Sequence, residues 1–511
     1  MDLSEVRWTD DYHGASSSIL EAETLAADAW GAARTRFLVN GTSSGIIASI
    51  CGTCGEGEEI IIPRNAHKSA VYGLVLSGAV PVYVQPEVVG TQRIRDGLLP
   101  GGFGGGQFSK EPVESVSDRL PEGLIGGLSP EALAAALGAH PAAKAVFAVS
   151  PTYHGVISDL ARLAELAHAH GLPLIADEAH GNHDYFSDRL PQGALDLGCD
   201  LVCQSTHKMS GSLTQSSMLH IGHGAETSGR VDFERVNRGL SLTQTTSPSY
   251  LLLASLDVAR SYIATEGERI LNGVLDALGE VRAEISGAPA ILGPNGNTGV
   301  FGIADSSGSF GIPGICVLGS ELVGSYDIYA YEPLRLVITA KGLGLSGYEL
   351  FRILREEYGV EAEFGDPVYC VCLAGLGTTR AHGNKLAAAL REISARFVHT
   401  DSVAQNKTSP CVLPSQDRRP VPLSCALPAL PPMVTTPREA WFAPKERVPF
   451  AEAVGRVSGE LVVPYPPGIP VLCPGERITP EVHDFLRWRQ AENCHLHCSA
   501  GDTLETILIV R

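Results

Sequence analysis

The chain has 511 residues, 44% of them apolar and 19% charged, and its 38 basic and 57 acidic residues give a formal net charge of −19. This length predicts two to four domains, and the acidic balance excludes nucleic acid as an expected partner because phosphate backbones would be repelled. No apolar run approaches the roughly 18 residues that a membrane-spanning helix requires, so we expect a soluble protein without membrane contact. The acidic N-terminus, MDLSEVRWTDDYHG, has no apolar signal core, which predicts that the cysteines are reduced and mostly buried.

In the first half of the chain, short apolar runs alternate with helical patterns. This alternation predicts βα units around a mostly parallel sheet, hence an α/β fold. One helical pattern covers 17–33, and a second covers 159–170, where Asp159 can cap the start and Gly171 follows the end. The clearest strands are predicted at 36–40, 59–63, 80–84, 145–150, 172–177 and 200–205.

Two irregular stretches divide the chain. The Gly-rich stretch 96–127 has no usable periodicity and predicts a mobile surface insertion, whereas the Pro- and Ser-rich stretch 400–438 predicts a linker. Between them, LRLVITAKG and a helical pattern at 348–359 indicate a smaller α+β unit. We therefore expect a large domain at 1–289, a small α+β domain at 290–399, the linker at 400–438 and a C-terminal domain at 439–511.

Polar residues follow three of the predicted strands. Lys208 ends the sequence Ser-Thr-His-Lys, Asp177 ends its strand, and Gly41–Gly45 joins the first strand to a helix. Parallel strands present their carboxyl ends at one edge of a sheet, and a helix N-terminus there favours an anion such as phosphate. A lysine amine, a strand-end carboxylate and a phosphate site are together what pyridoxal phosphate needs: a Schiff-base partner, a partner for the ring nitrogen and an anchor.

Six motifs in order carry a resemblance to a known family. The motifs are Asn40-Gly41-Thr42-Ser43-Ser44, Arg64-Asn65-Ala66-His67-Lys68-Ser69, Pro151-Thr152-Tyr153, Asp177-Glu178-Ala179-His180-Gly181, Ser205-Thr206-His207-Lys208 and Pro464-Tyr465-Pro466-Pro467-Gly468. With these motifs the chain resembles the ornithine/lysine/arginine decarboxylases, fold-type-I pyridoxal phosphate enzymes with an aspartate-aminotransferase-like large domain.

The resemblance implies a role for each matched residue. Lys208 would form the covalent bond to the cofactor, Asp177 would pair with the pyridinium nitrogen, and His67 would stack on the ring. Thr246 and Ser247 match positions that reach the phosphate of a neighbouring subunit, so the resemblance implies a homodimer or a higher homo-oligomer. The other expected cofactor-binding residues are Ser43, Ser44, Ala179, His180, Ser205 and His207, with the serines and His207 at the phosphate.

The reaction implied is decarboxylation of a basic amino acid to its amine and carbon dioxide, as in polyamine metabolism. Either Lys208 or His207 would return a proton to Cα. For the substrate's distal cation the candidate partners are Glu476 and Glu460, in the C-terminal unit. Arginine is favoured slightly over lysine and ornithine, because a chain without a long N-terminal regulatory domain resembles the shorter branch of the family.

The beginning of the chain departs from the family pattern. Family members normally begin with several dozen more residues, including a Pro-Gly-His-Lys segment, and none is visible here. We therefore expect differences in N-terminal packing and in assembly. The cytoplasm is the expected location, with a plastid as the alternative.

Several competing interpretations use the same residues. Gly41-Thr42-Ser43-Ser44-Gly45 also fits the G-x-S-x-G nucleophile elbow of a serine esterase, with Asp177 and His207 following in hydrolase order. That interpretation gives Lys208 no role. A catalytically inactive regulator with the decarboxylase fold is a third hypothesis, against which the retained Lys208, Asp177 and His67 argue. The acidic and histidine cluster 177–184 and the cysteine pairs Cys51/Cys54 and Cys494/Cys498 could suggest metal or redox sites, but divergent side chains and buried thiols are expected.

Overall fold

The computed structural model describes residues 9–86, 88–89, 123–287, 311–319, 322–324, 328–403, 427–465, 468–492, 494–499, 501 and 503–511, with the backbone alone at 88–89 and 399–403. The predicted insertion therefore lies outside the described residues up to residue 122, and the predicted linker lies outside them from 404 to 426.

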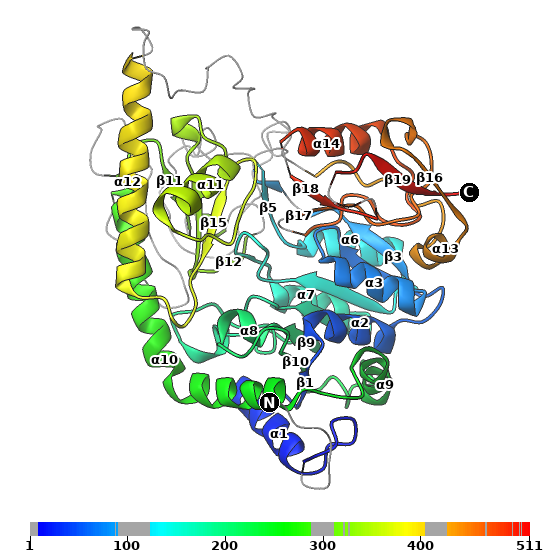
Figure 1. The fold of residues 1–511 in the computed structure, drawn as a ribbon. Coiled ribbons are helices and arrows are strands. Elements are labelled where there is room, and N and C mark those ends of the chain that lie inside the picture. Colours follow the sequence, from blue (N-terminus) through cyan, green and yellow to red (C-terminus); the bar gives the residue numbers. More distant parts are fainter. Residues whose placement is uncertain are drawn as a thin grey trace, which may run out of the picture.

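A seven-stranded sheet, in the order β1-β10-β9-β8-β6-β2-β3, forms the centre of the molecule (Figure 1). From β9 to β3 neighbouring strands are parallel, whereas β10 is antiparallel to both β1 and β9. The predicted mostly parallel α/β fold is thus confirmed, and each of the six predicted strands is present to within two residues; β10 was not predicted. The strands are β1 (Arg34–Leu38), β2 (Glu59–Pro63), β3 (Val80–Val84), β6 (Ala145–Val149), β8 (Leu174–Asp177), β9 (Leu201–Gln204) and β10 (Ser217–Ile221).

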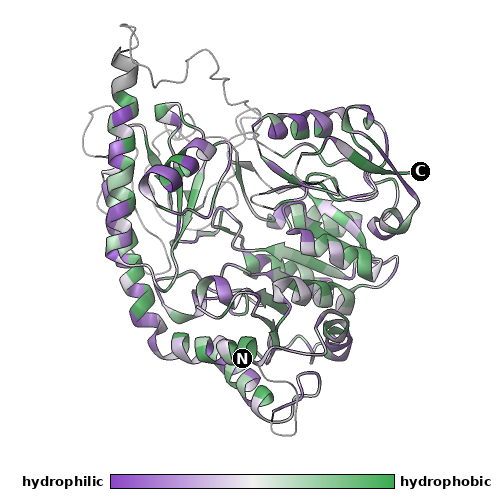
Figure 2. Ribbon diagram, in the orientation of Figure 1, coloured by the Kyte–Doolittle hydropathy of each residue, from purple (hydrophilic) through white to green (hydrophobic). Residues whose placement is uncertain are grey.

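Helices cover both faces of this sheet, and its strands β6, β8, β9 and β10 are buried at every position. One apolar cluster joins the sheet to α2, α3 and α9, and another joins its opposite face to α6 and α7. Figure 2 shows the resulting concentration of hydrophobic residues in the central strands. The helices are α1 (Ser18–Trp30), α2 (Gly41–Thr53), α3 (Lys68–Ser77), α6 (Pro130–Ala139), α7 (Leu160–Ala169), α8 (Thr206–Met209) and α9 (Phe233–Thr243).

The second predicted helix has the expected ends. The Asp159 side chain accepts a hydrogen bond from the Arg162 backbone N–H at 3.0 Å, and Gly171 follows with a φ of +71°. A carboxylate cap satisfies a backbone donor that the helix leaves free, and a glycine adopts a positive φ without steric cost.

A 37-residue helix, α10 (Tyr250–Ser286), runs from the large domain into the small one (Figure 1). Its second half, with Leu271, Leu278 and Ile285, packs in the same apolar cluster as α11 and α12. The small domain's core therefore begins before the predicted boundary at 289–290. Its other elements are β11 (Cys316–Leu318), β13 (Arg335–Thr339), α11 (Gly347–Tyr358), β14 (Phe364–Gly365), β15 (Cys370–Leu373) and α12 (Arg380–Val403), with sheet order β11-β13-β15-β14.

The ends of the two irregular stretches differ from the prediction. Leu124 and Ile125 form strand β5 and are buried, and Leu124 packs with apolar residues of both domains; the end of the predicted surface insertion is therefore wrong. Residues 400–403 still belong to α12, and α13 begins at Pro437, after a capping box formed by Thr436 and Glu439. Both ends of the predicted linker are thus helical.

Two short pairs of antiparallel strands lie outside the larger sheets: β4 (Val88–Val89) with β5 (Leu124–Ile125), and β7 (Val156–Ile157) with β12 (Ala330–Tyr331).

The C-terminal domain has its own apolar core and is joined to the large domain by a buried ion pair. Arg64 donates to both carboxylate oxygens of Glu476, at 2.6 and 2.8 Å, and to the Val471 carbonyl at 2.8 Å. Because both side chains are buried, this bidentate pair fixes one orientation of the domain. The elements are α13 (Pro437–Phe442), β16 (Lys445–Pro449), β17 (Val463–Tyr465), α14 (Pro480–Ala491), β18 (His495–His497) and β19 (Thr506–Val510).

Two further expectations concern membranes and thiols. Across the ranges described above, no helix combines the length and the apolar character needed to cross a bilayer. Every cysteine within those ranges is a free thiol, including Cys51, Cys54, Cys494 and Cys498. The predicted reduced state agrees with this.

Candidate active site

A cavity of about 370 Å³ lies at the carboxyl edge of the parallel strands. Most of its wall comes from the large domain, while Glu363 and Phe364 come from the small domain and Tyr465 from the C-terminal domain. The structure therefore brings residues from three units to one place. The predicted site residues that line the cavity are Ser43, His67, Asp177, Ala179, His180, Ser205, His207 and Lys208.

Lys208 lies in the one-turn helix α8, directly after β9. Its Nζ atom is 2.9 Å from Nε2 of His180. Burial lowers the pKa of Lys208, and the negative charge of Asp177 opposes this effect. A lowered pKa increases the fraction of neutral amine, which is the nucleophilic form.

Asp177 is the last residue of β8, and its carboxylate is buried in the cavity wall. Its Oδ1 atom accepts a hydrogen bond of 3.2 Å from the Ala179 backbone. Burial raises the pKa of Asp177 to about 6, although Lys208 and the Ala179 hydrogen bond act to lower it. A desolvated carboxylate facing a cavity is stabilised by a cationic N–H donor placed there, which is what a protonated pyridine ring offers.

The turn from β1 into α2 also lines the cavity. Gly41 has a φ of +76°, a conformation that favours glycine. Thr42 Oγ1 lies 2.5 Å from Ser205 Oγ and 2.9 Å from Ser217 Oγ, and Ser43 also lines the cavity. Hydroxyl groups and the N-terminus of a 13-residue helix thus meet at one point, an arrangement that suits a phosphate group. With the amine and the carboxylate, these residues fit pyridoxal phosphate.

Ser44 lies behind this turn and is not part of the cavity wall. Its hydroxyl donates to the Gly41 carbonyl at 2.6 Å and accepts from Gln244 at 2.5 Å. Gln244 also accepts a hydrogen bond of 3.1 Å from the Val39 backbone. The expected direct contact of Ser44 with phosphate is therefore corrected: its hydroxyl is engaged in holding the turn.

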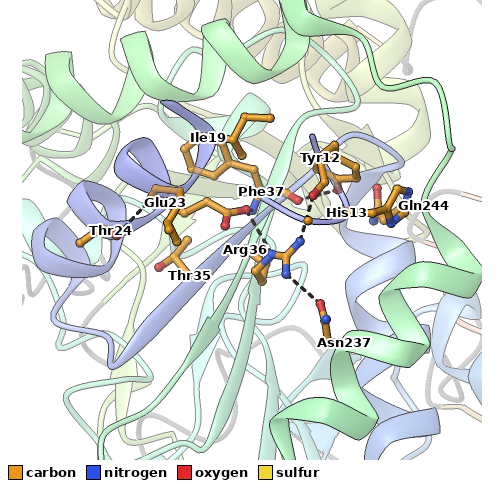
Figure 3. Close-up of polar contacts among 12 residues, drawn as sticks. Tyr12, His13, Ile19, Glu23, Thr24, Thr35, Arg36, Phe37, Asn237 and Gln244 are labelled. Atoms are coloured by element: carbon orange, nitrogen blue, oxygen red, sulfur yellow. Dashed lines mark hydrogen bonds and ion pairs between the residues drawn. The ribbon is translucent and has the colours of Figure 1, made fainter. Parts of the chain in front are cut away.

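An ion pair between the buried Glu23 and the part-buried Arg36 links α1 to β1, as Figure 3 shows. Glu23 of α1 contacts Arg36 of β1 at 3.2 Å and accepts the Phe37 N–H at 2.8 Å. Arg36 also donates to Asn237 of α9 at 2.7 Å. The N-terminal helix, the first strand and α9 are thereby linked next to Gln244.

His67 is the N-cap of α3, and its imidazole lines the cavity. Its Nδ1 atom accepts the Ser69 backbone N–H at 3.3 Å and lies 2.8 Å from the Ser69 hydroxyl. Burial, together with the charges of Lys208 and Lys68, lowers the pKa of His67 to about 4. A neutral, fixed ring of this kind can stack on a flat cofactor.

The serine-esterase interpretation is wrong. Ser43 lies in the first turn of α2, whereas a nucleophile elbow places its serine on the strained turn between strand and helix. His207 binds the Ser216 carbonyl through Nδ1 at 2.8 Å, and no contact with Ser43 accompanies this bond among the described residues. Lys208 lines the same cavity, and a serine esterase would give it no role.

The structure does not bring Glu476 and Glu460 to the cavity. Glu476 is fully buried in its pair with Arg64 and also accepts the Cys473 N–H at 2.7 Å. Glu460 accepts backbone N–H groups of Ser499 and Leu508. Both carboxylates are satisfied within the C-terminal domain or its joint, so their expected contact with a substrate cation is corrected.

The carboxylate that the sequence analysis missed is Glu363, which lies exposed just before β14 and lines the cavity. A single glutamate just before a short strand gives no motif from which its position could have been inferred. Tyr153 and Tyr465 also line the cavity, and both belong to motifs quoted above without an assigned role.

The acidic and histidine residues of the cluster 177–184 point to three different surroundings. Asp177 and His180 face the cavity, whereas Glu178 accepts hydrogen bonds from Gln204, Tyr185 and the Ala194 backbone. The ligand-type atoms of the remaining two residues, His183 and Asp184, lie with that of Glu332 within 4.8 Å of one another. His183 Nε2 is 3.1 Å from Glu332, an ion-pair distance that links the large and small domains.

Comparisons with known proteins give one consistent result. The family described as Orn/Lys/Arg decarboxylase, major domain, matches residues 1–382, and its C-terminal domain matches 424–496. Arginine decarboxylase of Bacillus subtilis is 36% identical over 95% of this chain and 84% of that protein. Arginine decarboxylase of Halalkalibacterium halodurans is 34% identical over 100% of this chain and 89% of that protein. The structure of lysine decarboxylase A from Pseudomonas aeruginosa superposes with a TM-score of 0.68 at 20% identity, covering 100% of this chain and 74% of that one, which supports the fold.

The buried carboxylate generates a stability prediction. In the cofactor-free protein, Asp177→Asn should raise the free energy of unfolding by about 2–3 kcal/mol at pH 7, since folding raises the carboxyl pKa from 3.8 to about 6. The wild-type protein loses about 2–3 kcal/mol of stability as the pH rises from about 3.8 through 6, because its buried carboxyl group must then ionise. The stability difference between Asp177→Asn and the wild type should therefore disappear below about pH 4. Urea unfolding of both proteins between pH 4 and pH 8 measures this difference in the free energy of unfolding. A variant that is less stable at pH 7, or equally altered at every pH, would contradict the assignment.

Proposed function

The chain belongs to the Orn/Lys/Arg decarboxylase family, pyridoxal phosphate enzymes that decarboxylate basic amino acids, and on this basis we propose that its substrate is arginine. The observation that carries this proposal is that the chain is more similar to relatives named arginine decarboxylase than to relatives named lysine decarboxylase. Four relatives named arginine decarboxylase are 32–36% identical over at least 93% of the chain. Relatives named lysine decarboxylase are 23–25% identical.

The cavity residues divide into those that would hold the cofactor and those that would meet the substrate. Lys208 would bind the cofactor covalently, Asp177 would keep a proton on the ring nitrogen, and His67 would lie against the ring face. Thr42, Ser43, Ser205 and His207 would bind the phosphate, helped by the N-terminus of α2. When bound, pyridoxal phosphate supplies the electron sink that takes up the electrons of the bond between Cα and the carboxylate.

Glu363 would receive the distal guanidinium of arginine. It lines the cavity from the small domain, and its charge interacts with that of Lys208. A guanidinium presents a planar fork of donors that matches a carboxylate in a bidentate way, whereas an ammonium acts as a point charge. The exposed position of Glu363 leaves its two oxygens accessible to a ligand that enters from solvent.

A homodimer would complete the phosphate site. Thr246 and Ser247 are exposed and do not line the cavity of their own chain. Large apolar side chains are exposed on either side of them, with Leu242 at 84% and Leu251 at 49%. We infer that this surface faces a second copy, whose cavity receives the two hydroxyl groups.

The proposed activity predicts the outcome of a direct assay. With pyridoxal phosphate added, the protein should release carbon dioxide and agmatine from arginine, with kcat/KM at least about tenfold higher than for lysine or ornithine. Lys208→Ala should abolish this activity and the visible absorbance of the bound cofactor. Faster turnover of lysine or ornithine would contradict the choice of arginine, and unchanged activity of Lys208→Ala would contradict the mechanism.

The role of Glu363 predicts a specific kinetic defect. Glu363→Gln should raise KM for arginine about 10- to 100-fold with a much smaller change in kcat, because a charge-assisted hydrogen-bonded pair is lost in binding. Glu361→Gln is the matched control, since Glu361 lies two residues away and pairs with Arg355 on the surface. Equal effects of the two substitutions would show that Glu363 has no specific role.

The shared phosphate site predicts complementation between two inactive variants. Lys208→Ala lacks the amine, and Ser247→Glu would repel the phosphate of the partner's cofactor. A mixed dimer contains one intact site, so mixing after dissociation should restore up to about a quarter of wild-type activity. Activity no higher than that of the separate variants, despite mixed dimers detected by mass spectrometry, would contradict a shared site.

A further inference from the structure

The contact between His180 and Lys208 is not used by the roles assigned so far. His180 lies in the turn after β8, three residues beyond Asp177, and its Nε2 atom is 2.9 Å from Lys208 Nζ. The two side chains thus meet across two neighbouring parallel strands, β8 and β9. This distance is that of a direct hydrogen bond between an imidazole and an amine.

The other histidines of the cavity are engaged elsewhere. His207 binds the Ser216 carbonyl through Nδ1, which assigns the ring proton to that nitrogen. His67 binds the Ser69 backbone N–H through Nδ1. Among the residues described here, His180 is the imidazole recorded at hydrogen-bond distance from Lys208.

The protonation states fix the direction of the hydrogen bond. Burial, and the positive charges of Lys208 and Arg335, hold the pKa of His180 well below its ordinary value, so the ring is neutral. When Lys208 is an ammonium group it can only donate, so Nε2 then accepts and the ring proton lies on Nδ1. Nδ1 is buried and has no hydrogen-bond partner within the described ranges. An unpaired buried donor is unfavourable for folding, and its retention suggests a functional reason for placing an imidazole here.

We propose that His180 is a positioning residue that holds Lys208 Nζ in its ammonium form inside the cavity, and that Lys208 rather than His207 thereby delivers the proton to Cα. This rests on the proposed role of Lys208. After the carboxylate has left as carbon dioxide, Lys208 gives up one proton to Cα and becomes a neutral amine. The neutral amine is then the nucleophile needed to release the product, so the proton count balances.

Other charges around Lys208 act on the same equilibrium. Burial favours the neutral amine, and so does the positive charge of Arg335, which is fully buried behind Tyr153. A hydrogen-bond acceptor at 2.9 Å counteracts these effects at short range. The groups that face Lys208 are Asp177 of β8, His180 of the following turn, His67 at the start of α3, Arg335 of β13, Glu363 before β14 and the adjacent His207.

The first test measures the pKa of Lys208 in the cofactor-free protein, by competitive labelling with acetic anhydride at a series of pH values. His180→Phe keeps a ring but removes the acceptor, and should lower this pKa by about one to two units. His180→Gln places an amide oxygen near the position of Nε2 and should recover at least half of the shift. His170→Phe, a control at the exposed C-cap of α7, should cause no change. An unchanged pKa in folded His180→Phe would overturn the proposal.

A second measurement needs no substitution at His180. In protein labelled with ¹⁵N-histidine, the Nε2 resonance should have the chemical shift of an unprotonated acceptor and should change as Lys208 titrates. Lys208→Met should remove that change. A protonated Nε2, or a response that persists in Lys208→Met, would overturn the proposal even if His180→Phe failed to fold.

The reaction itself gives a third readout. Because the ammonium is required, kcat should fall as the pH rises through the pKa of Lys208, and in His180→Phe this fall should occur at a pH lower by the same one to two units, with KM little changed. A structural defect alone would not change the pH at which kcat falls. The labelling and resonance measurements use no substrate, so they remain valid whichever amino acid is decarboxylated.

Discussion

The interaction on which the site depends is the one between two opposite charges at the edge of the sheet, the buried carboxylate of Asp177 and the amine of Lys208. Asp177 ends β8, Lys208 follows the neighbouring parallel strand β9 in helix α8, and desolvation acts against the charged form of each. In such surroundings a carboxylate keeps its charge only if a cation or an N–H donor meets it. A protonated ring nitrogen placed there would be stabilised by Asp177, and in the proposed arrangement the hydroxyl-rich turn before α2 and the ring of His67 hold the rest of the cofactor.

A second constraint is that three units of the chain build one cavity. The large domain supplies the proposed cofactor-binding residues, but Glu363 and Tyr465 come from the small and C-terminal domains. The positions of these two walls depend on buried polar joints: Arg64 with Glu476 at the C-terminal domain, and His183 with Glu332 at the small domain. Breaking a buried ion pair leaves an uncompensated charge, so substitutions far from the cavity can alter substrate binding through these joints.

The sequence predicted well what depends on local patterns and poorly what depends on distant partners. The strands carrying Asp177 and Lys208 could be placed because buried parallel strands are short apolar runs and because strand ends meet at one edge. Glu476 was assigned wrongly because its partner, Arg64, lies 412 residues away in the sequence. Glu363 was missed for the same reason, since only the packing of the small domain brings it to the cavity. The strand β10 was missed because it is antiparallel and does not belong to a βα unit.

The central claim is that Asp177 keeps a proton on the cofactor ring nitrogen. It can be tested by loading the protein with pyridoxal phosphate labelled with ¹⁵N in the ring and recording the nitrogen chemical shift as a function of pH. We expect the shift of a protonated pyridinium throughout the range from about pH 6.5 to about pH 9, because a charge-assisted bond to a buried carboxylate holds the proton well above the ordinary pKa of the ring. The shift of an unprotonated pyridine at neutral pH would contradict the account.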